Sequence, residues 1–111
     1  MSSKSLDQTL AALADPQRRA VVDLLRDRPR AAGDLARALG ITPPAMSRHL
    51  RALREGQLVE ESHPPFDARV RVYALKPAPM LELRVWLDET ERLWSEQLSA
   101  FKRHAEQATA P

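Results

Sequence analysis

A single apolar stripe near the C-terminus constrains the fold of this chain more than any other feature. Over residues 79–107, apolar side chains recur at steps of three and four residues, the near-heptad spacing of one face of a long helix. Trp86 and Leu93 widen this stripe. About 29 residues extend roughly 43 Å as a helix, whereas a 100-residue globule has a radius of gyration of about 13 Å. The stripe consists of Leu83, Leu87, Thr90, Trp94, Leu98, Phe101 and Ala105.

The remainder of the 111-residue chain is too short to cover such a helix. Two tryptophans and a phenylalanine, at about 150–250 Å² each, would leave an apolar patch too large for a soluble monomer. We therefore expect a homodimer that pairs through its terminal helices, within residues 1–13 and 79–107. An apolar effector held near Trp86 and Trp94 is the alternative, and packing is favoured over it. The predicted interface residues are Leu6, Leu10, Leu83, Trp86, Leu87, Thr90, Trp94, Leu98 and Phe101.

The composition excludes several classes of protein. There is no cysteine, which removes disulfides, thiolate metal ligands and thiol nucleophiles. The three histidines, His49, His63 and His104, lie on different predicted elements, and no pair of acidic residues has an informative spacing, so we expect neither an enzyme nor a cofactor. No apolar run approaches the roughly 20 residues that cross a bilayer, and the N-terminus lacks the apolar region of a secretory signal. We expect one domain over residues 1–111, in the cytoplasm and without a membrane partner.

Prolines and capping residues divide the preceding part of the chain into short helices. Asp15 is an expected N-cap because Pro16 follows it, and Thr42 stands in the same relation to Pro43. Gly40 occupies the position that favours a left-handed C-cap. The expected helices cover residues 6–13, 16–26, 32–39 and 43–55.

The order of the central elements is that of a winged helix. Helices over 32–39 and 43–55, joined by a tight turn, form a helix-turn-helix at 32–55. Two strands follow over 58–62 and 69–75, separated by a loop whose two prolines cannot join a ladder. We therefore predict a mainly α fold with a small β-hairpin, the wing, at 58–75. The expected order of elements is α-α-α-α-β-β-α.

The helix over 43–55 has the character of a DNA-reading helix. Placing Met46, Leu50 and Leu53 in the core turns a face with two arginines and a serine toward solvent, and no carboxylate precedes Glu55. Arginine bonds guanine edges bidentately, and hydroxyl groups suit base or phosphate contacts. Residues 30–76 also carry the excess positive charge of the chain. The predicted DNA-binding residues are Thr42, Pro44, Ser47, Arg48, His49 and Arg51, together with Arg69 and Arg71 on the wing.

Simpler interpretations of these side chains remain open. His49 lies beside the apolar stripe, so packing is as well supported as a phosphate contact, and Arg69 and Arg71 could lie on a plain solvent-facing strand. For Arg18 or Arg19 we expect an internal salt bridge. A winged-helix module that binds another protein, without specific DNA binding, is the main alternative function.

Three stretches of the sequence carry a family resemblance. Residues 13–19 and 34–36, and above all Met46–Glu55 with its Ser-x-His-Leu-x-x-Leu core, are similar to the corresponding motifs of ArsR/SmtB-type winged-helix repressors. The resemblance spans residues 6–103. It implies a homodimer paired through its first and last helices on a palindromic double-stranded DNA operator, with helix 43–55 in the major groove and release on an inducing signal.

Two departures from the family pattern concern the end of that helix and the metal sites. Gly56-Gln57 stands where the family has Ala-Gly, so the helix is expected to end a residue early. The Cys-x-Cys cluster of metal sensors is replaced by residues 31–34, and around Asp88 and His104 the metal-ligand motifs of the last helix are incomplete. The chain thus resembles the non-metal-sensing branch. A metal-responsive repressor with an atypical site and an unidentified small-molecule effector stay open as alternatives.

Overall fold

The computed structural model describes residues 3–109 and confirms the predicted winged helix-turn-helix class, with a small antiparallel sheet. Residues 1–2 and 110–111 lie outside the described residues. They are the ends of the predicted domain 1–111, and residues 1–2 also begin the predicted dimer segment 1–13. The elements are α1 (Ser3–Ala12), α2 (Pro16–Leu24), β1 (Arg30–Ala31), α3 (Ala32–Leu39), α4 (Pro43–Glu55), β2 (Val59–Ser62), β3 (Val72–Leu75) and α5 (Pro77–Thr109).

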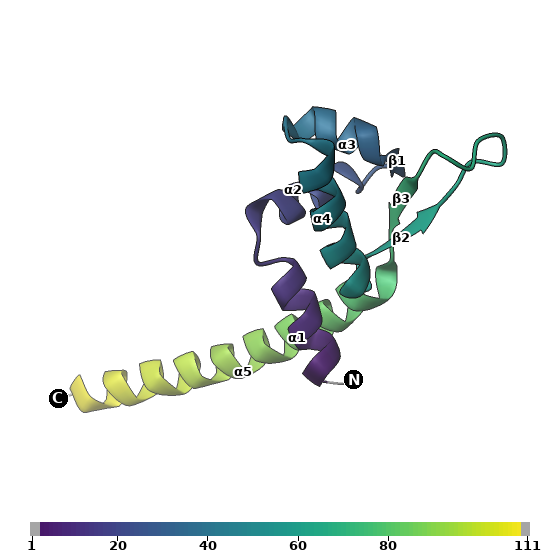
Figure 1. Ribbon diagram of the computed structural model, residues 1–111. Helices are drawn as coiled ribbons and strands as arrows, with labels where there is room; N and C mark the ends of the chain where they lie inside the picture. The colour runs from purple at the N-terminus through teal and green to yellow at the C-terminus, as the bar shows by residue number, and fades with distance from the viewer. Residues whose placement is uncertain (1–2, 110–111) are drawn as a thin grey trace.

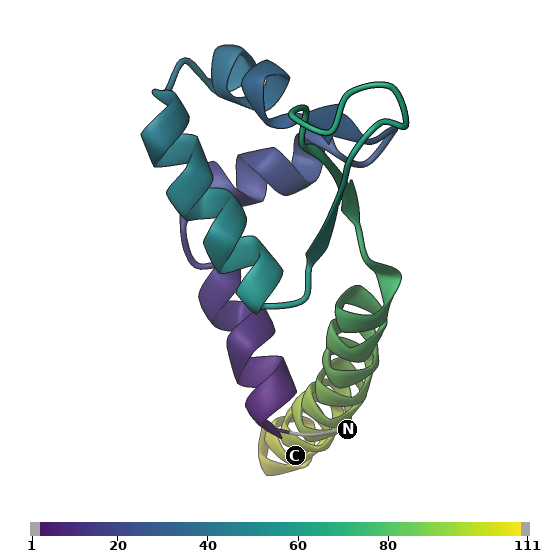
Figure 2. The same cartoon turned by 45° about the vertical axis from the view of Figure 1, so that its right-hand side comes forward.

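The molecule consists of a small winged-helix body and a projecting helix. Helix α1 lies against the start of α5 and the end of α4, while the rest of α5 extends away from the body (Figures 1 and 2). At the opposite end from α5 lie α3, the start of α4 and the loop between β2 and β3 (Figure 1). The long axis measures 76 Å and the radius of gyration is 20.0 Å. This value far exceeds the roughly 13 Å of a compact chain of this size.

The body is held together by one apolar cluster. Helix α4 contributes Met46, Leu50 and Leu53, all but inaccessible to solvent, as the helical spacing predicts. Helix α2 adds Val21, and Leu35 comes from α3. Burial of these side chains fixes which face of α4 points outward.

The predicted helix caps are present. Asp15 accepts hydrogen bonds from the backbone N–H groups of Gln17 and Arg18, at 2.7 and 3.2 Å. Partial burial opposes ionisation, but these two bonds lower the pKa of the Asp15 carboxyl group. The Thr42 side chain caps α4, and Gly40 takes the left-handed conformation after α3 with φ of 64°. These caps fix the turn between α3 and α4.

The sheet differs from the predicted hairpin in two respects. A short strand, β1, which the sequence analysis did not predict, pairs with β3, so that the strand order is β1-β3-β2. The second hairpin strand begins at Val72 instead of residue 69, which moves Arg69 and Arg71 from the predicted strand into the loop. The cause is local: the Asp67 side chain accepts from the Arg69 N–H, and the Asp67 carbonyl accepts from the Val70 N–H. These turns keep the chain out of the ladder.

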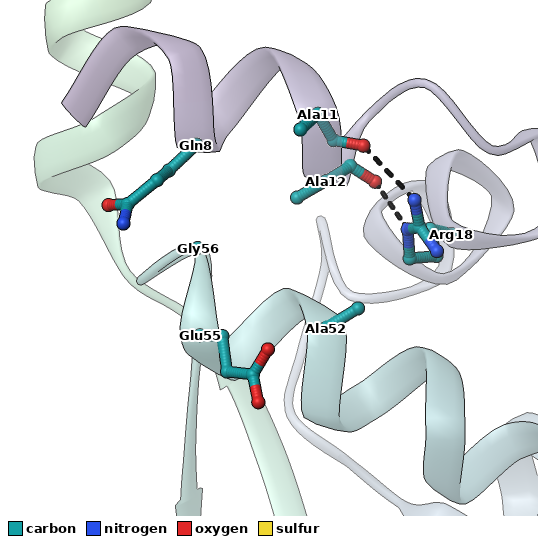
Figure 3. Close-up of a pocket in the computed structure, with 7 residues that line it drawn as sticks. All are labelled: Gln8, Ala11, Ala12, Arg18, Ala52, Glu55 and Gly56. Carbon is teal, nitrogen blue, oxygen red and sulfur yellow. Dashed lines mark hydrogen bonds between the residues drawn. The ribbon is translucent and has the colours of Figure 1, made fainter. Parts of the chain in front are cut away.

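The end of α4 lies directly on α1. A Cβ atom built at Gly56 would be 3.0 Å from the Ala12 Cβ and 3.4 Å from the Gln8 carbonyl oxygen, so a side chain here would require α1 to move by a few tenths of an ångström. Next along the chain, Gln57 takes the left-handed conformation with φ of 62°. A hollow of about 260 Å³ lies beside this contact (Figure 3).

Within residues 3–109, neither Arg18 nor Arg19 forms the expected internal salt bridge. Arg18 donates to the carbonyl oxygens of Ala11 and Ala12 at 3.0 and 2.6 Å (Figure 3). Arg19 donates to the Leu13 carbonyl oxygen at 2.7 Å. The two guanidinium groups thus bond carbonyl oxygens at and just after the end of α1 and complement its dipole.

Candidate nucleic-acid interface

The exposed face of α4 carries the side chains that the helical spacing predicts there. Pro44, Ser47, Arg48 and Arg51 are all exposed, and Thr42 is exposed at the helix start. Among the described residues, no carboxylate oxygen lies within 4.0 Å of the guanidinium nitrogens of Arg48 or Arg51. Both arginines are therefore available to an external acceptor.

His49 points toward the body rather than outward. Its Nε2 atom lies 2.7 Å from Oε1 of Gln17, in the first turn of α2, and the residue is half-buried. This contact joins α4 to α2 and favours the packing interpretation of His49. A contact between His49 and DNA stays a prediction.

The wing loop is a hydrogen-bonded structure rather than a loose connection. The Asp67 N–H donates to the Pro64 carbonyl at 3.2 Å, and Nδ1 of His63 lies 2.9 Å from the Val70 carbonyl oxygen. Arg69 stands on this loop with its side chain 93% exposed, 3.3 Å from an Asp67 carboxylate oxygen. Phe66, which the sequence analysis did not select, is 88% exposed beside it. The loop therefore presents Arg69 at its outer edge.

Arg71 occupies a different place, at the base of the wing. Together with side chains of α4 and β3 it lines a small cavity of about 120 Å³ between helix and sheet. Two members of this group, Arg54 and Tyr73, are absent from the predicted DNA-binding set. Arg54 could have been found, because it follows Ser47 and Arg51 at steps of four and three on one helix face. The lining residues are Ser47, Arg51, Arg54, Arg71 and Tyr73.

Behind the cavity, the carboxylate of Glu61 joins helix and sheet. One of its oxygens, Oε2, accepts from the Tyr73 hydroxyl at 2.8 Å and from Nη1 of Arg54 at 2.9 Å. The bond from Tyr73 lowers the pKa of Glu61, and the charges of Arg54 and Arg71 lower it further although burial opposes them. Burial raises the pKa of Tyr73, and its bond to Glu61 raises it further. Glu61 is thus ionised and orients Arg54.

Replacing Tyr73 with phenylalanine is expected to lower the free energy of unfolding near pH 7 by about 1.5 kcal/mol, the contribution of a hydrogen bond to a charged group. Because the folded state lowers the pKa of Glu61, this contribution is present above the usual glutamate pKa of about 4.3. It is lost as the pH falls through the lower folded value. Urea titrations of the wild type and the variant at about pH 7 and about pH 3 measure the difference in the free energy of unfolding at each pH. An equal difference at the two pH values would contradict the assignment.

The apolar stripe of α5 is exposed over most of its length. Every residue over 84–108 is exposed, with Trp94 at 63% and Phe101 at 71%. At the start of the helix, Ser5 of α1 donates to the Glu82 carboxylate at 2.8 Å, and Leu83 is half-buried. The predicted interface residues Trp86, Leu87, Thr90 and Leu98 are exposed, as is Leu10, whereas Leu6 is half-buried.

The described part of the chain contains neither a cluster of metal-ligating side chains nor a helix that could span a membrane. Within residues 3–109, no group of three or more histidine or acidic side chains is placed to hold a metal ion. No helix in this part of the chain combines the length and the apolar character needed to span a bilayer.

The chain is similar to known regulators over most of its length. A model of a helix-turn-helix domain matches residues 13–62. The HTH-type transcriptional regulator Rv2034 of Mycobacterium tuberculosis is 41% identical over 98 residues, which cover 88% of this chain and 86% of that protein.

Solved structures give the same result. An ArsR-like transcriptional regulator from Rhodococcus sp. RHA1 superposes with a TM-score of 0.75 at 27% identity, covering 92% of this chain and 93% of that one. The homodimeric winged helix-turn-helix DNA-binding domain of Mb0332 from Mycobacterium bovis has a TM-score of 0.63 at 27% identity, covering 81% and 82%. These similarities are to transcriptional regulators and not to enzymes. The chain belongs to the ArsR family of winged helix-turn-helix transcriptional regulators.

Proposed function

We propose that this protein is a sequence-specific repressor that binds a palindromic operator as a homodimer, with α4 in the major groove and the wing beside the minor groove. The observation that carries the proposal is the exposure of Arg48 and Arg51 on one face of α4, without a carboxylate partner among the described residues. Ser47 adds a hydroxyl group to this face. Guanidinium groups in the major groove bond guanine edges bidentately.

The start of α4 suits the phosphate backbone. Thr42 caps the helix and Pro44 lies in its first turn, with both residues exposed. The helix dipole favours a negative charge at this end. Pro43 and Pro44 have no backbone N–H and the Ala45 N–H is bonded to the Thr42 side chain, so the Thr42 hydroxyl group is the donor that this end offers to a phosphate. Arg69, exposed at the edge of the wing loop, is proposed to contact the adjacent minor groove, where arginine is a common contact.

The dimer part of the proposal is supported by the exposed stripe of α5. Side chains such as Trp94 and Phe101 would form an apolar patch of a size that soluble monomers rarely expose. The Mb0332 domain, described as homodimeric, shares this fold. Pairing through α5 places the two subunits' α4 helices on either side of a two-fold axis, as binding to a palindrome requires.

Selection of bound fragments from genomic DNA, followed by footprinting, tests the proposal. We expect two inverted half-sites whose centres are about 10–10.5 base pairs, or a multiple of this, apart. Regulation through a protein partner alone would leave no protected sequence. A reporter placed behind the selected site should be lowered by the protein, and a reporter that is raised would contradict the repressor role.

The salt dependence of binding separates DNA from protein partners. Phosphate contacts should give a slope of log affinity against log salt concentration of about −0.9 for each phosphate neutralised. With six to ten such contacts, affinity should fall about 10³- to 10⁵-fold between 50 and 200 mM salt. Fluorescence anisotropy of a labelled duplex measures this slope. A slope near zero would favour the protein-interaction alternative.

A further inference from the structure

We propose that the cavity between α4 and the base of the wing binds one phosphate group of the DNA backbone. This phosphate cleft is the cavity lined by Ser47, Arg51, Arg54, Arg71 and Tyr73. The inference rests on the proposed function, because it assigns the ligand for one edge of the same DNA-facing surface. It adds Arg54 to that surface and gives Arg71 a defined target. Arg51 borders the cleft but stays assigned to the base-reading face, and Tyr73 is buried and donates its hydroxyl hydrogen to Glu61, so neither is assigned to the phosphate.

The charge of the phosphate cleft suits an anion. Three guanidinium groups and a serine hydroxyl line it, and none of its lining residues is acidic. Glu61 contacts the lining residues Arg54 and Tyr73, but its own side chain is only 15% exposed. One carboxylate against three arginines leaves positive charge uncompensated. Guanidinium groups match phosphate geometry through paired hydrogen bonds.

The cleft is organised before any ligand arrives. Glu61 holds Nη1 of Arg54 at 2.9 Å, and the same oxygen accepts from the Tyr73 hydroxyl at 2.8 Å. Glu61 and Tyr73 are direct cross-strand partners of β2 and β3, so the sheet fixes both. A guanidinium group has five N–H donors, so Arg54 keeps most of them for a ligand. An arginine held in this way loses little side-chain freedom on binding.

Position and size favour a backbone phosphate over a base edge. Recognition helices contact base edges mainly through their first residues, while phosphate contacts fix the orientation of the protein. Arg54 lies in the last turn of α4, and Arg71 comes from the wing base. A volume of about 120 Å³ corresponds to a few water molecules and accommodates a phosphate group.

A methylphosphonate scan of the operator tests the proposal. In this scan each phosphate of one half-site is replaced in turn by a neutral methylphosphonate, and affinity is measured for the wild-type protein and for Arg54→Gln. For the wild type we expect one position at which the replacement weakens binding by about tenfold, as for the loss of a charge-assisted bond. For Arg54→Gln the penalty at that position should fall below twofold. The matched control, Arg37→Gln on α3, should keep the full penalty.

The variant Arg71→Gln tests the same phosphate contact independently, from the wing side of the phosphate cleft. It should remove the penalty at the same phosphate, and thermal melts of all three variants check that they fold. A penalty that persists in both cleft variants would overturn the inference. A second result would also overturn the inference: the protein binds its operator specifically, but no single phosphate replacement weakens binding. If, in addition, millimolar inorganic phosphate shifts the Tyr73 NMR signals to a saturating end point, the ligand of the cleft is free phosphate. A wild-type protein that bound no DNA would overturn the proposed function and this inference with it, which distinguishes that outcome from a failure of the cleft alone.

Discussion

The variant that replaces both Arg48 and Arg51 with alanine is expected to lose specific operator binding by at least about 100-fold and to keep its fold. Each bidentate contact between arginine and guanine contributes about 1–3 kcal/mol of discrimination, and a dimer would lose two from each subunit. Both side chains are exposed, and exposed substitutions usually change stability by less than about 0.5 kcal/mol. Gel-shift titrations with operator and with unrelated DNA measure the loss, and a thermal melt checks the fold.

The matched control removes the same charge from a different surface. Arg92 and Arg103 lie together on α5 beside Ser95 and Ser99, away from the apolar stripe. The variant Arg92→Ala with Arg103→Ala should bind the operator within a few-fold of the wild type. Unchanged affinity in the Arg48 and Arg51 variant would defeat the assignment of α4 as the reading helix.

Replacing Trp94 and Phe101 with glutamate is expected to convert the proposed dimer into monomers. Both side chains are largely exposed in the single subunit, so the substitutions cost the isolated fold little. In a dimer they would put four carboxylates into an apolar interface, where unpaired charges are strongly disfavoured. Sedimentation should then give a species of 12.5 kDa. Operator affinity should fall by about 10²- to 10⁴-fold, because two linked half-site contacts become independent.

The control for this variant uses the same helix and the same added charge. Ser95→Glu with Ser99→Glu changes the opposite face of α5, and this variant should remain dimeric. A wild-type protein that sediments as a 12.5 kDa species at micromolar concentration would contradict the dimer.

Local signals made the helices predictable. Thr42 and Gly40 define the ends of α3 and α4 through backbone chemistry that acts within a few residues, and the structure gives both helices the predicted bounds. The shorter second hairpin strand, by contrast, depends on hydrogen bonds that Asp67 makes in a turn. Strand β1 contains only two residues, so no alternation can reveal it.

The candidate site was predictable only where a local sequence pattern determines it. The exposure of Arg48 and Arg51 follows from the helical period, which needs no knowledge of distant contacts. The pairing of Glu61 with Tyr73 depends on the register of two strands, and joining the predicted strands end to end would have put Glu61 opposite Val70. The contact of His49 with Gln17 joins residues 32 positions apart, which no local pattern specifies.

The contact between Gly56 and Ala12 has a mechanical consequence. Backbone and Cβ atoms meet there without a flexible side chain between them, so a displacement of α1 cannot be absorbed at this point. Helix α1 is also tied to α5 through Ser5 and Glu82. We therefore expect a rearrangement of the terminal helices to change the tilt of α4. In the proposed dimer, a molecule that separates the two subunits is therefore expected to weaken operator binding without contacting α4.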